Sequence, residues 1–187
     1  MPAASPAIRE HVKLSYWITA SGTVLSIGGP WDTWLGRDGD LPDQCCEAKV
    51  VGNSLFSFIE NDGVRHVYRT MHARVFETGR AIAFPFRCDS PWLRRDMQMN
   101  MTRDGDALRY DSVIISETRR QRPLPQPTPS ATTLIAMCSF CKAYRFPIAS
   151  QIWKDIESLF METHLPELFS VTHGMCEPCA ASWLAEV

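Results

Sequence analysis

Four cysteines near the end of the sequence have the spacing of metal ligands. They form two pairs with two residues between the members of each: Cys138 and Cys141 in CSFC, and Cys176 and Cys179 in CEPC. This spacing lets both sulfurs of a pair turn toward one point, and two such pairs supply the ligands of a tetrahedral thiolate site. We therefore predict that these four residues bind one metal ion per chain, with structural zinc as the expected metal.

Two other interpretations of the cysteines stay open. Cysteine pairs also hold iron–sulfur clusters, and a CxxC pair can act as a redox dithiol. A thioredoxin-type motif has one CxxC in a βαβ unit, whereas this sequence has two beside an apolar helical pattern. His173, three residues before Cys176, could replace a ligand or donate a hydrogen bond to a sulfur. Because four cysteines already complete a closed site, we expect the hydrogen-bonding role.

Two helices are expected to position these cysteines. Residues 150–162 have an amphipathic pattern whose apolar face could cover the metal. Its apolar residues are Ile152, Trp153, Ile156, Leu159 and Phe160. A second helix is predicted to start at the second pair, with Pro178 in its first turn and residues 180–186 running on. Its free backbone N–H groups would then point toward thiolate sulfurs.

The N-terminal part of the chain has the pattern of strands around one longer helix. Residues 16–18 and 24–27 predict a hairpin, with a turn at Ser21-Gly22. The apolar stripe over 62–78 predicts an amphipathic helix that ends at Gly79. Alternating apolar residues then predict three antiparallel strands, the last two joined by a tight Asp-Gly turn: 82–88, 97–102 and 108–116.

This order of elements resembles the PAS domain, a small sensory fold. The segment VVGNSLFSFIENDGVRHVYRTMHARVFETGRAIAFPFR, residues 50–87, looks like the central PAS signature. The resemblance covers residues 12–118 and implies an α+β fold with a five-stranded antiparallel sheet and helices on one face. It also implies a ligand pocket or a homodimer surface in this part of the chain.

The C-terminal motifs resemble a short cysteine-rich tail that some bacterial sensor and signalling proteins carry. The matching residues are CSFCK, Trp153, Glu157 and THGMCEPC, within residues 137–180. The stretch KAYRFP departs from the longer basic run usual after the first pair in such tails. We therefore expect a small zinc-stabilised module, and our hypothesis is that it presents the helix at 150–162 to a signalling partner.

A proline-rich segment separates the two parts. Residues 119–129, RRQRPLPQPTP, contain four prolines, which interrupt helix and sheet and favour an extended spacer. We therefore predict a PAS-like domain at 12–118, a linker at 119–132 and a four-cysteine zinc module at 133–187.

Some residues of the first part are candidates for a pocket. Some PAS domains bind haem through a histidine on the helix before the last three strands, and His72 lies at the edge of the apolar stripe there, whereas His66 lies opposite it. Met97, Met99 and Met101 share one face of a predicted strand, where thioethers suit either a pliable pocket or core packing. For His72 the alternative is a boundary histidine without a ligand.

Composition and charge narrow the functional classes. The chain has 187 residues, a net charge of −2 and a pI of about 6.2, so it has no overall positive field for nucleic acid. It shows no apolar run of about 20 residues, no nucleophile elbow, no P-loop and no dinucleotide fingerprint, and residues 1–13 lack the apolar stretch expected of a secretory signal. We expect a cytoplasmic, non-catalytic regulatory protein of bacterial signal transduction that binds a small molecule or a protein. The alternatives are a redox sensor that uses zinc-bound thiolates and a haem-binding PAS sensor.

Overall fold

The larger part of the protein is a five-stranded antiparallel sheet with the strand order β2-β1-β5-β4-β3. The computed structural model describes residues 13–35, 46–128, 131–162 and 169–186. Parts of the predicted domain, linker and module lie outside the described residues: 12, 36–45, 129–130, 163–168 and 187. The strands are β1 Lys13–Thr19, β2 Val24–Gly28, β3 Ile82–Arg87, β4 Leu93–Asp104 and β5 Ala107–Arg119.

The predicted hairpins are confirmed, and the last two strands extend beyond their predicted limits. β4 and β5 pair from Leu93↔Arg119 to Asp104↔Ala107, and Gly105 at the turn has a φ of 61°. The expected Asp-Gly turn therefore closes this hairpin. β1 pairs with β5 in the middle of the sheet, so the first and last strands of this part are neighbours.

Helix α3 spans Asp62–Thr78, as predicted. The Asn61 side chain accepts a hydrogen bond from the Val64 N–H at 3.0 Å and caps the N-terminus. At the other end Gly79 has a φ of 67°, a left-handed conformation that glycine adopts without strain. The buried face of the helix carries Val64, Met71, His72 and Val75.

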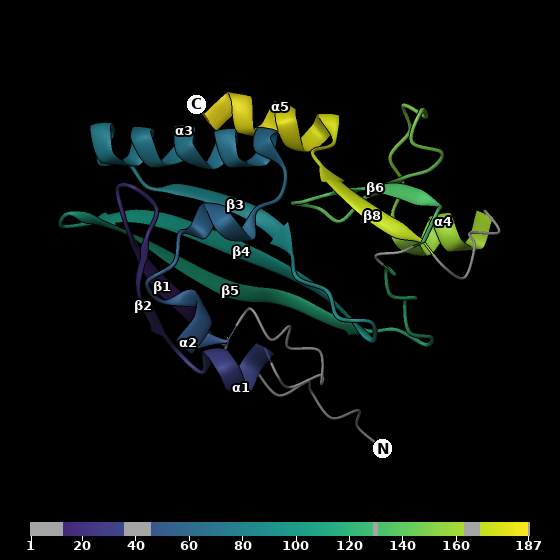
Figure 1. The fold of residues 1–187 in the computed structure, drawn as a ribbon, viewed down its shortest axis with the longest axis horizontal. Helices are drawn as coiled ribbons and strands as arrows, with labels where there is room; N and C mark the ends of the chain where they lie inside the picture. Colours follow the sequence, from purple (N-terminus) through teal and green to yellow (C-terminus); the bar gives the residue numbers. More distant parts are fainter. Residues whose placement is uncertain (1–12, 36–45, 129–130, 163–168, 187) are drawn as a thin grey trace, which may run out of the picture.

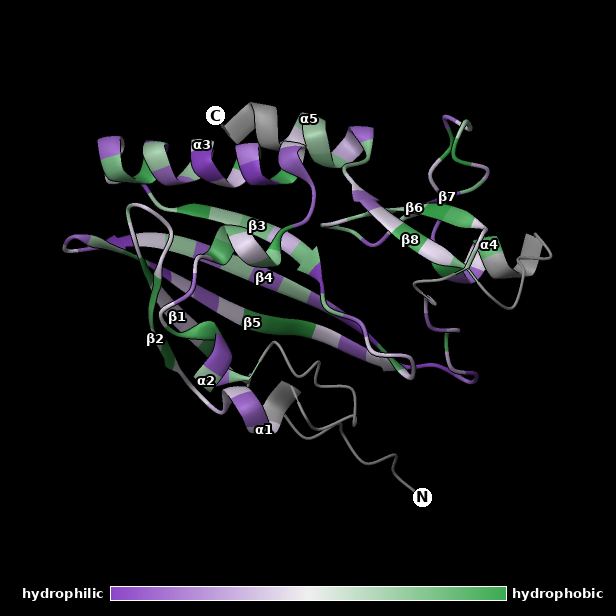
Figure 2. Ribbon diagram, viewed as in Figure 1, coloured by the Kyte–Doolittle hydropathy of each residue, from purple (hydrophilic) through white to green (hydrophobic). Residues whose placement is uncertain are grey.

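The core lies between α3 and the sheet. Figure 1 shows α3 running along one side of the five-stranded sheet, with the short helices α1 Trp31–Leu35 and α2 Glu47–Val50 near β1 and β2. The 3-10 helix η3 Leu55–Phe58 is tied to the β1–β2 turn by a hydrogen bond from the Leu55 N–H to the Gly22 carbonyl. Figure 2 shows the alternation of hydrophilic and hydrophobic residues along the strands. Large side chains that are fully buried include Tyr110, Ile18, Met71, Met101 and Leu108.

The C-terminal part contains a small sheet that the sequence did not predict. Three strands have the order β7-β6-β8: β6 Leu134–Cys138, β7 Tyr144–Arg145 and β8 Ser170–Gly174. β6 pairs with β8 in parallel and with β7 in antiparallel. The predicted second helix is present as α5 Glu177–Glu186.

The helix predicted at 150–162 is shorter than expected. α4 spans Ile156–Glu162, and residues 150–155 are not helical. The backbone of Lys154 instead pairs with that of Tyr144 through hydrogen bonds of 2.7 and 2.8 Å. The N–H and C=O groups of Lys154 are therefore bonded to another strand segment and cannot take part in helical hydrogen bonds. The apolar pattern of this segment reflects packing and not a continuous helix.

The two parts share one hydrophobic core. Buried Phe140, in the CSFC turn, stacks on Tyr68 of α3 with ring centroids 6.1 Å apart and meets Phe84 of β3 edge-on. Buried Cys138 and Cys176 belong to the same core cluster as Val64 and Met71 of α3. The predicted linker packs as well, since the Leu124 and Thr128 N–H groups donate to carbonyl oxygens of Pro91 and Phe169.

An ion-pair network joins the same two parts. Arg120 binds Glu157 of α4 and Asp89, each at 2.7 Å, and its side chain is 7% exposed. Arg87 at the end of β3 pairs with Asp89 and lies 2.9 Å from Asp155. Arginines this buried are tolerated because several carboxylates surround them. The RCDSP stretch, residues 87–91, therefore forms part of the contact with the C-terminal module.

Loss of the Arg120 side chain should destabilise the protein. Arg120→Ala would remove one of the two arginines that Asp89 and Glu157 share, leaving Arg87, and we expect the free energy of unfolding to fall by about 3 kcal/mol. Arg122→Ala, which truncates an exposed arginine, is the matched control and should change it by less than about 0.5 kcal/mol. Urea unfolding measures both, and equal effects would show that the network contributes nothing.

Candidate metal centre and adjoining pocket

Parallel pairing of β6 with β8 brings the two cysteine pairs together. Cys138 is the last residue of β6 and lies opposite Gly174 at the end of β8. Ser139 extends the pairing by donating its N–H to the Gly174 carbonyl at 2.9 Å. Cys176 follows two residues after Gly174, just before α5. Residues far apart in the sequence therefore meet at one edge of the small sheet.

The local backbone turns each pair inward. In the first pair, the Lys142 N–H donates to the Cys138 carbonyl at 3.1 Å, and the Cys138 N–H donates to the Ala143 carbonyl at 2.8 Å. Lys142 has a φ of 55°, which completes the turn. In the second pair, Cys179 lies in the first turn of α5, one helical turn after Cys176.

The four sulfurs are close enough to surround one ion. All lie within 4.8 Å of one another, and the Sγ atoms of Cys141 and Cys176 are 3.6 Å apart. A tetrahedral site with metal–sulfur bonds of about 2.3 Å has sulfurs about 3.8 Å apart. The donor set and its geometry therefore fit a four-coordinate thiophilic metal ion.

The centre is buried on one side and open on the other. Cys138 and Cys176 are 0% and 2% exposed, whereas Cys141 and Cys179 are half-buried. The Cys176 N–H points at the Cys138 sulfur, 3.5 Å away. A backbone donor of this kind stabilises a thiolate at Cys138.

Cys138, Cys141 and Cys179 shift one another's pKa. Hydrogen bonds from Cys141 and Cys179 hold the pKa of Cys138 well below its ordinary value. The hydrogen bond with Cys138 raises the pKa of Cys141 to about 11, and the pKa of Cys179 is raised as well, mainly by Cys138. Cys138 is therefore favoured as a thiolate over Cys141 and Cys179, and a bound cation would supply the charge that stabilises further thiolates.

His173 lies beside the centre and outside the group of four sulfurs. Its ring Nδ1 lies 3.4 Å from a carboxylate oxygen of Glu60, and its carbonyl accepts a 2.9 Å hydrogen bond from the Asn61 side chain. No hydrogen bond joins its ring to a sulfur in the described part of the chain. Its ring instead lines a pocket.

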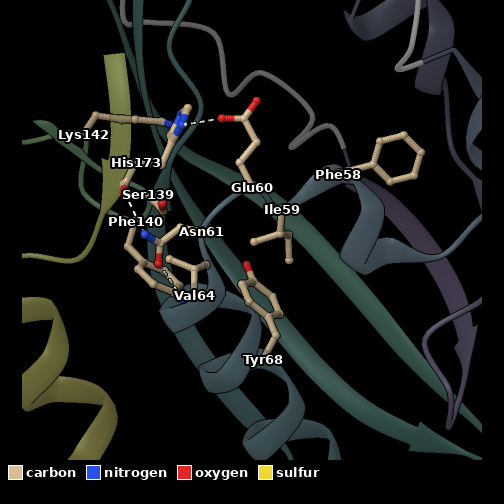
Figure 3. A pocket seen from close by; sticks show the side chains of 10 residues that line it. All are labelled: Phe58, Ile59, Glu60, Asn61, Val64, Tyr68, Ser139, Phe140, Lys142 and His173. Carbon is tan, nitrogen blue, oxygen red and sulfur yellow. Dashed lines mark hydrogen bonds and ion pairs between the residues drawn. The ribbon is translucent and has the colours of Figure 1, made fainter. Parts of the chain in front are cut away.

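That pocket lies between the start of α3 and the CSFC turn, and its volume is about 270 Å³. Figure 3 shows Glu60, Lys142 and His173 at one end and the Tyr68 ring at the other. Its lining comes from η3, α3, the CSFC turn and β8: Phe58, Ile59, Glu60, Asn61, Val64, Tyr68, Ser139, Phe140, Lys142 and His173. No sequence pattern indicated this pocket, because its walls come from both parts of the chain.

The residues predicted for a PAS pocket are placed in the core, and none of them lines this pocket. Met97, Met99 and Met101 are buried between neighbouring strands. His72 is 4% exposed, and its Nε2 hydrogen-bonds the buried Tyr110 hydroxyl. Ligation of a haem iron by this nitrogen would require that bond to break.

No protein-family model and no curated protein matches the sequence. Similar solved structures include the PAS domain of the Cronobacter turicensis RpfR quorum-sensing receptor, in complexes with C12:0 and with BDSF. Both are 12% identical to this chain with a TM-score of 0.40, covering 59% of it and 100% of their own chains. A domain of an HTR-like protein from Haloarcula marismortui is 18% identical with a TM-score of 0.37, covering 56% and 98%.

The α+β, PAS-like description stands on the chain's own elements. Two strands, a helical middle, one long helix and three antiparallel strands follow one another as predicted and form the five-stranded sheet. Among the described residues, no helix has both the length and the apolarity needed to cross a bilayer.

Burial of His72 should make stability depend on pH. Desolvation lowers the pKa of His72 to about 4, from an ordinary 6.5. Between these two pH values His72 is protonated in the unfolded chain and neutral in the folded chain. The contribution of neutral His72 to the free energy of unfolding is therefore fully present above about pH 6.5 and is lost as the pH falls toward 4. The Tyr110 hydroxyl and the Tyr68 and Phe56 rings surround the imidazole and add no charge.

The change from pH 7 to pH 4 should cost about 3 kcal/mol through this histidine. His72→Gln should therefore flatten the pH dependence of the free energy of unfolding by that amount, whereas exposed His66→Gln should leave it unchanged. Urea titrations across the range measure both slopes. An unaltered slope in His72→Gln would contradict the assignment.

Proposed function

We propose that this chain is a non-catalytic regulatory protein in which a PAS-like domain is joined to a module built around one zinc ion. The observation that carries the proposal is the convergence of the Cys138, Cys141, Cys176 and Cys179 sulfurs within 4.8 Å of one another. Zinc is the proposed metal because a four-thiolate tetrahedral set is the usual closed structural site for zinc. Bound there, zinc would neutralise the thiolates and stabilise the fold.

The metal would also hold the module against the PAS-like domain. Phe140 lies between the two cysteines of the first pair, so closure of the CSFC turn around a metal fixes the ring that stacks on Tyr68. The module has only short strands and one short helix besides α5, and so small a unit gains much of its stability from metal binding.

The regulatory role rests on the PAS-like fold and on the resemblance of the C-terminal motifs to tails of bacterial signalling proteins. We propose that the signal is a small molecule or a partner protein in the cytoplasm, and that the PAS-like part can form a homodimer. In this proposal the domains are those expected from the sequence, 12–118 and 133–187. A change at the sheet or α3 would reach the module through Phe140 and the ion-pair network.

Metal analysis tests the proposal directly. Protein purified under reducing conditions should contain about one zinc ion per chain, and Cys138→Ser with Cys176→Ser should abolish binding. The same double variant should lose at least about 3 kcal/mol of unfolding free energy, measured by denaturation.

Cys46→Ser is the matched control, because Cys46 lies outside the cluster, and it should retain the metal. Protein without metal would overturn the proposal. Bound iron with absorption in the visible range would show that the four cysteines hold an iron–sulfur cluster and not zinc.

Redox sensing is a second candidate, favoured by the partial exposure of Cys141 and Cys179. Oxidation of two thiolates to a disulfide, with peroxide reduced to water, would remove two ligands and release zinc. A purely structural zinc site should instead retain its zinc under mild peroxide, as measured with a colorimetric chelator. Zinc release that dithiothreitol reverses would instead establish the sensor.

A further inference from the structure

The pocket between α3 and the CSFC turn contains polar groups that are not used in the fold. Among the described residues, no hydrogen-bond partner exists for the Tyr68 hydroxyl, the Ser139 hydroxyl or the Lys142 ammonium. The His173 Nδ1 is buried, and its 3.4 Å approach to Glu60 does not form a hydrogen bond. A buried nitrogen is ordinarily paired, so the His173 Nδ1, with the three other polar groups that line the same pocket, indicates a missing ligand.

The pocket favours negative charge. Lys142 supplies a cation, and α3 begins at Asp62 beside the pocket, so its dipole adds partial positive charge. Burial raises the pKa of Tyr68 to about 12, which keeps this hydroxyl a neutral donor. Glu60 is the negatively charged residue in the pocket lining, and its carboxylate would repel an anion. Its side chain is 82% exposed at the rim of the pocket, so water screens this repulsion.

The remaining walls are apolar. Phe140 and Val64 are buried, and Ile59 and Phe58 complete the lining. A volume of about 270 Å³ suits a ligand of few heavy atoms. The ligand that matches both features has one anionic end and one short apolar or aromatic end.

We infer that this pocket binds a small organic monocarboxylate whose charged group is held by Lys142, Ser139 and His173 and whose apolar end lies against Phe140 and Val64. The inference deepens the proposed function by naming a ligand class and its site. It rests on that function in one respect, because Ser139, Phe140 and Lys142 are held by the turn that the metal closes.

Asn61 fixes the geometry of the site. Its side-chain oxygen caps α3 by accepting from Val64, and its amide nitrogen donates to the carbonyl of His173. One side chain therefore ties the start of the helix to β8 across the pocket. Movement of the module relative to α3 would open the site, so carboxylate binding stabilises the docked arrangement.

Benzoate is a suitable probe, with benzamide as its neutral counterpart. Isothermal titration calorimetry, on protein whose zinc content has been measured, should give saturable benzoate binding with a dissociation constant of about 1 mM or lower. Benzamide should bind at least about tenfold more weakly, because it lacks the charge that Lys142 recognises. Inorganic phosphate tests for a site that takes any anion, and phosphate binding as tight as benzoate would overturn the organic part of the assignment.

Two substitutions with opposite expected signs distinguish this site from unspecific binding. Lys142→Met should weaken benzoate binding about tenfold, whereas Glu60→Gln should tighten it about threefold by removing the competing carboxylate. Lys49→Met, on exposed α2, should leave it unchanged. Weakened binding in Glu60→Gln, or equal binding in Lys142→Met, would overturn the inference.

Zinc content measured in the same samples separates the two proposals. Zinc-loaded protein that fails to bind benzoate contradicts the ligand site alone. Metal-free protein that binds benzoate contradicts the zinc proposal and keeps the site, and failure of both measurements removes both. Retention of zinc by Lys142→Met shows that a loss of affinity comes from the side chain and not from a collapsed turn.

Discussion

Parallel pairing between β6 and β8 is the constraint on which the C-terminal half depends. It sets Cys138 opposite Gly174, and the two cysteine pairs then face each other across the end of the small sheet. A parallel pair needs a long crossover connection, and the chain between the strands, which includes β7 and α4, provides it. The placement of the four cysteines around one point is thus a consequence of strand register.

The same turn that carries the first cysteine pair completes the core of the PAS-like part. Phe140 enters between Tyr68 and Phe84, and charged side chains close the contact at its edge, where Arg87 and Arg120 meet carboxylates from both parts. Hydrophobic burial supplies the affinity of this contact, and the paired charges fix its register. The four cysteines, the adjoining pocket and the docking of the module are therefore linked through a few side chains.

Local patterns predicted the elements whose stability is local or alternates regularly. The apolar stripe and Gly79 located α3 to its ends, and alternation with an Asp-Gly turn located the last hairpin. The pattern at 150–162 was misleading because Lys154 pairs with Tyr144, a partner that the sequence does not identify. The strands of the small sheet are too short for periodicity to distinguish them from loops.

The sequence by itself determined the donor set, since two CxxC pairs bring their own sulfurs together through short turns. It also determined the order of elements of the PAS-like part. Only the tertiary structure decided that His173 faces Glu60 and a pocket, that His72 is engaged by Tyr110, and that the module shares the core. The physical reason is range: turns and periodicity act over a few residues, whereas a pocket wall or a buried hydrogen bond joins residues that only the packed chain makes neighbours.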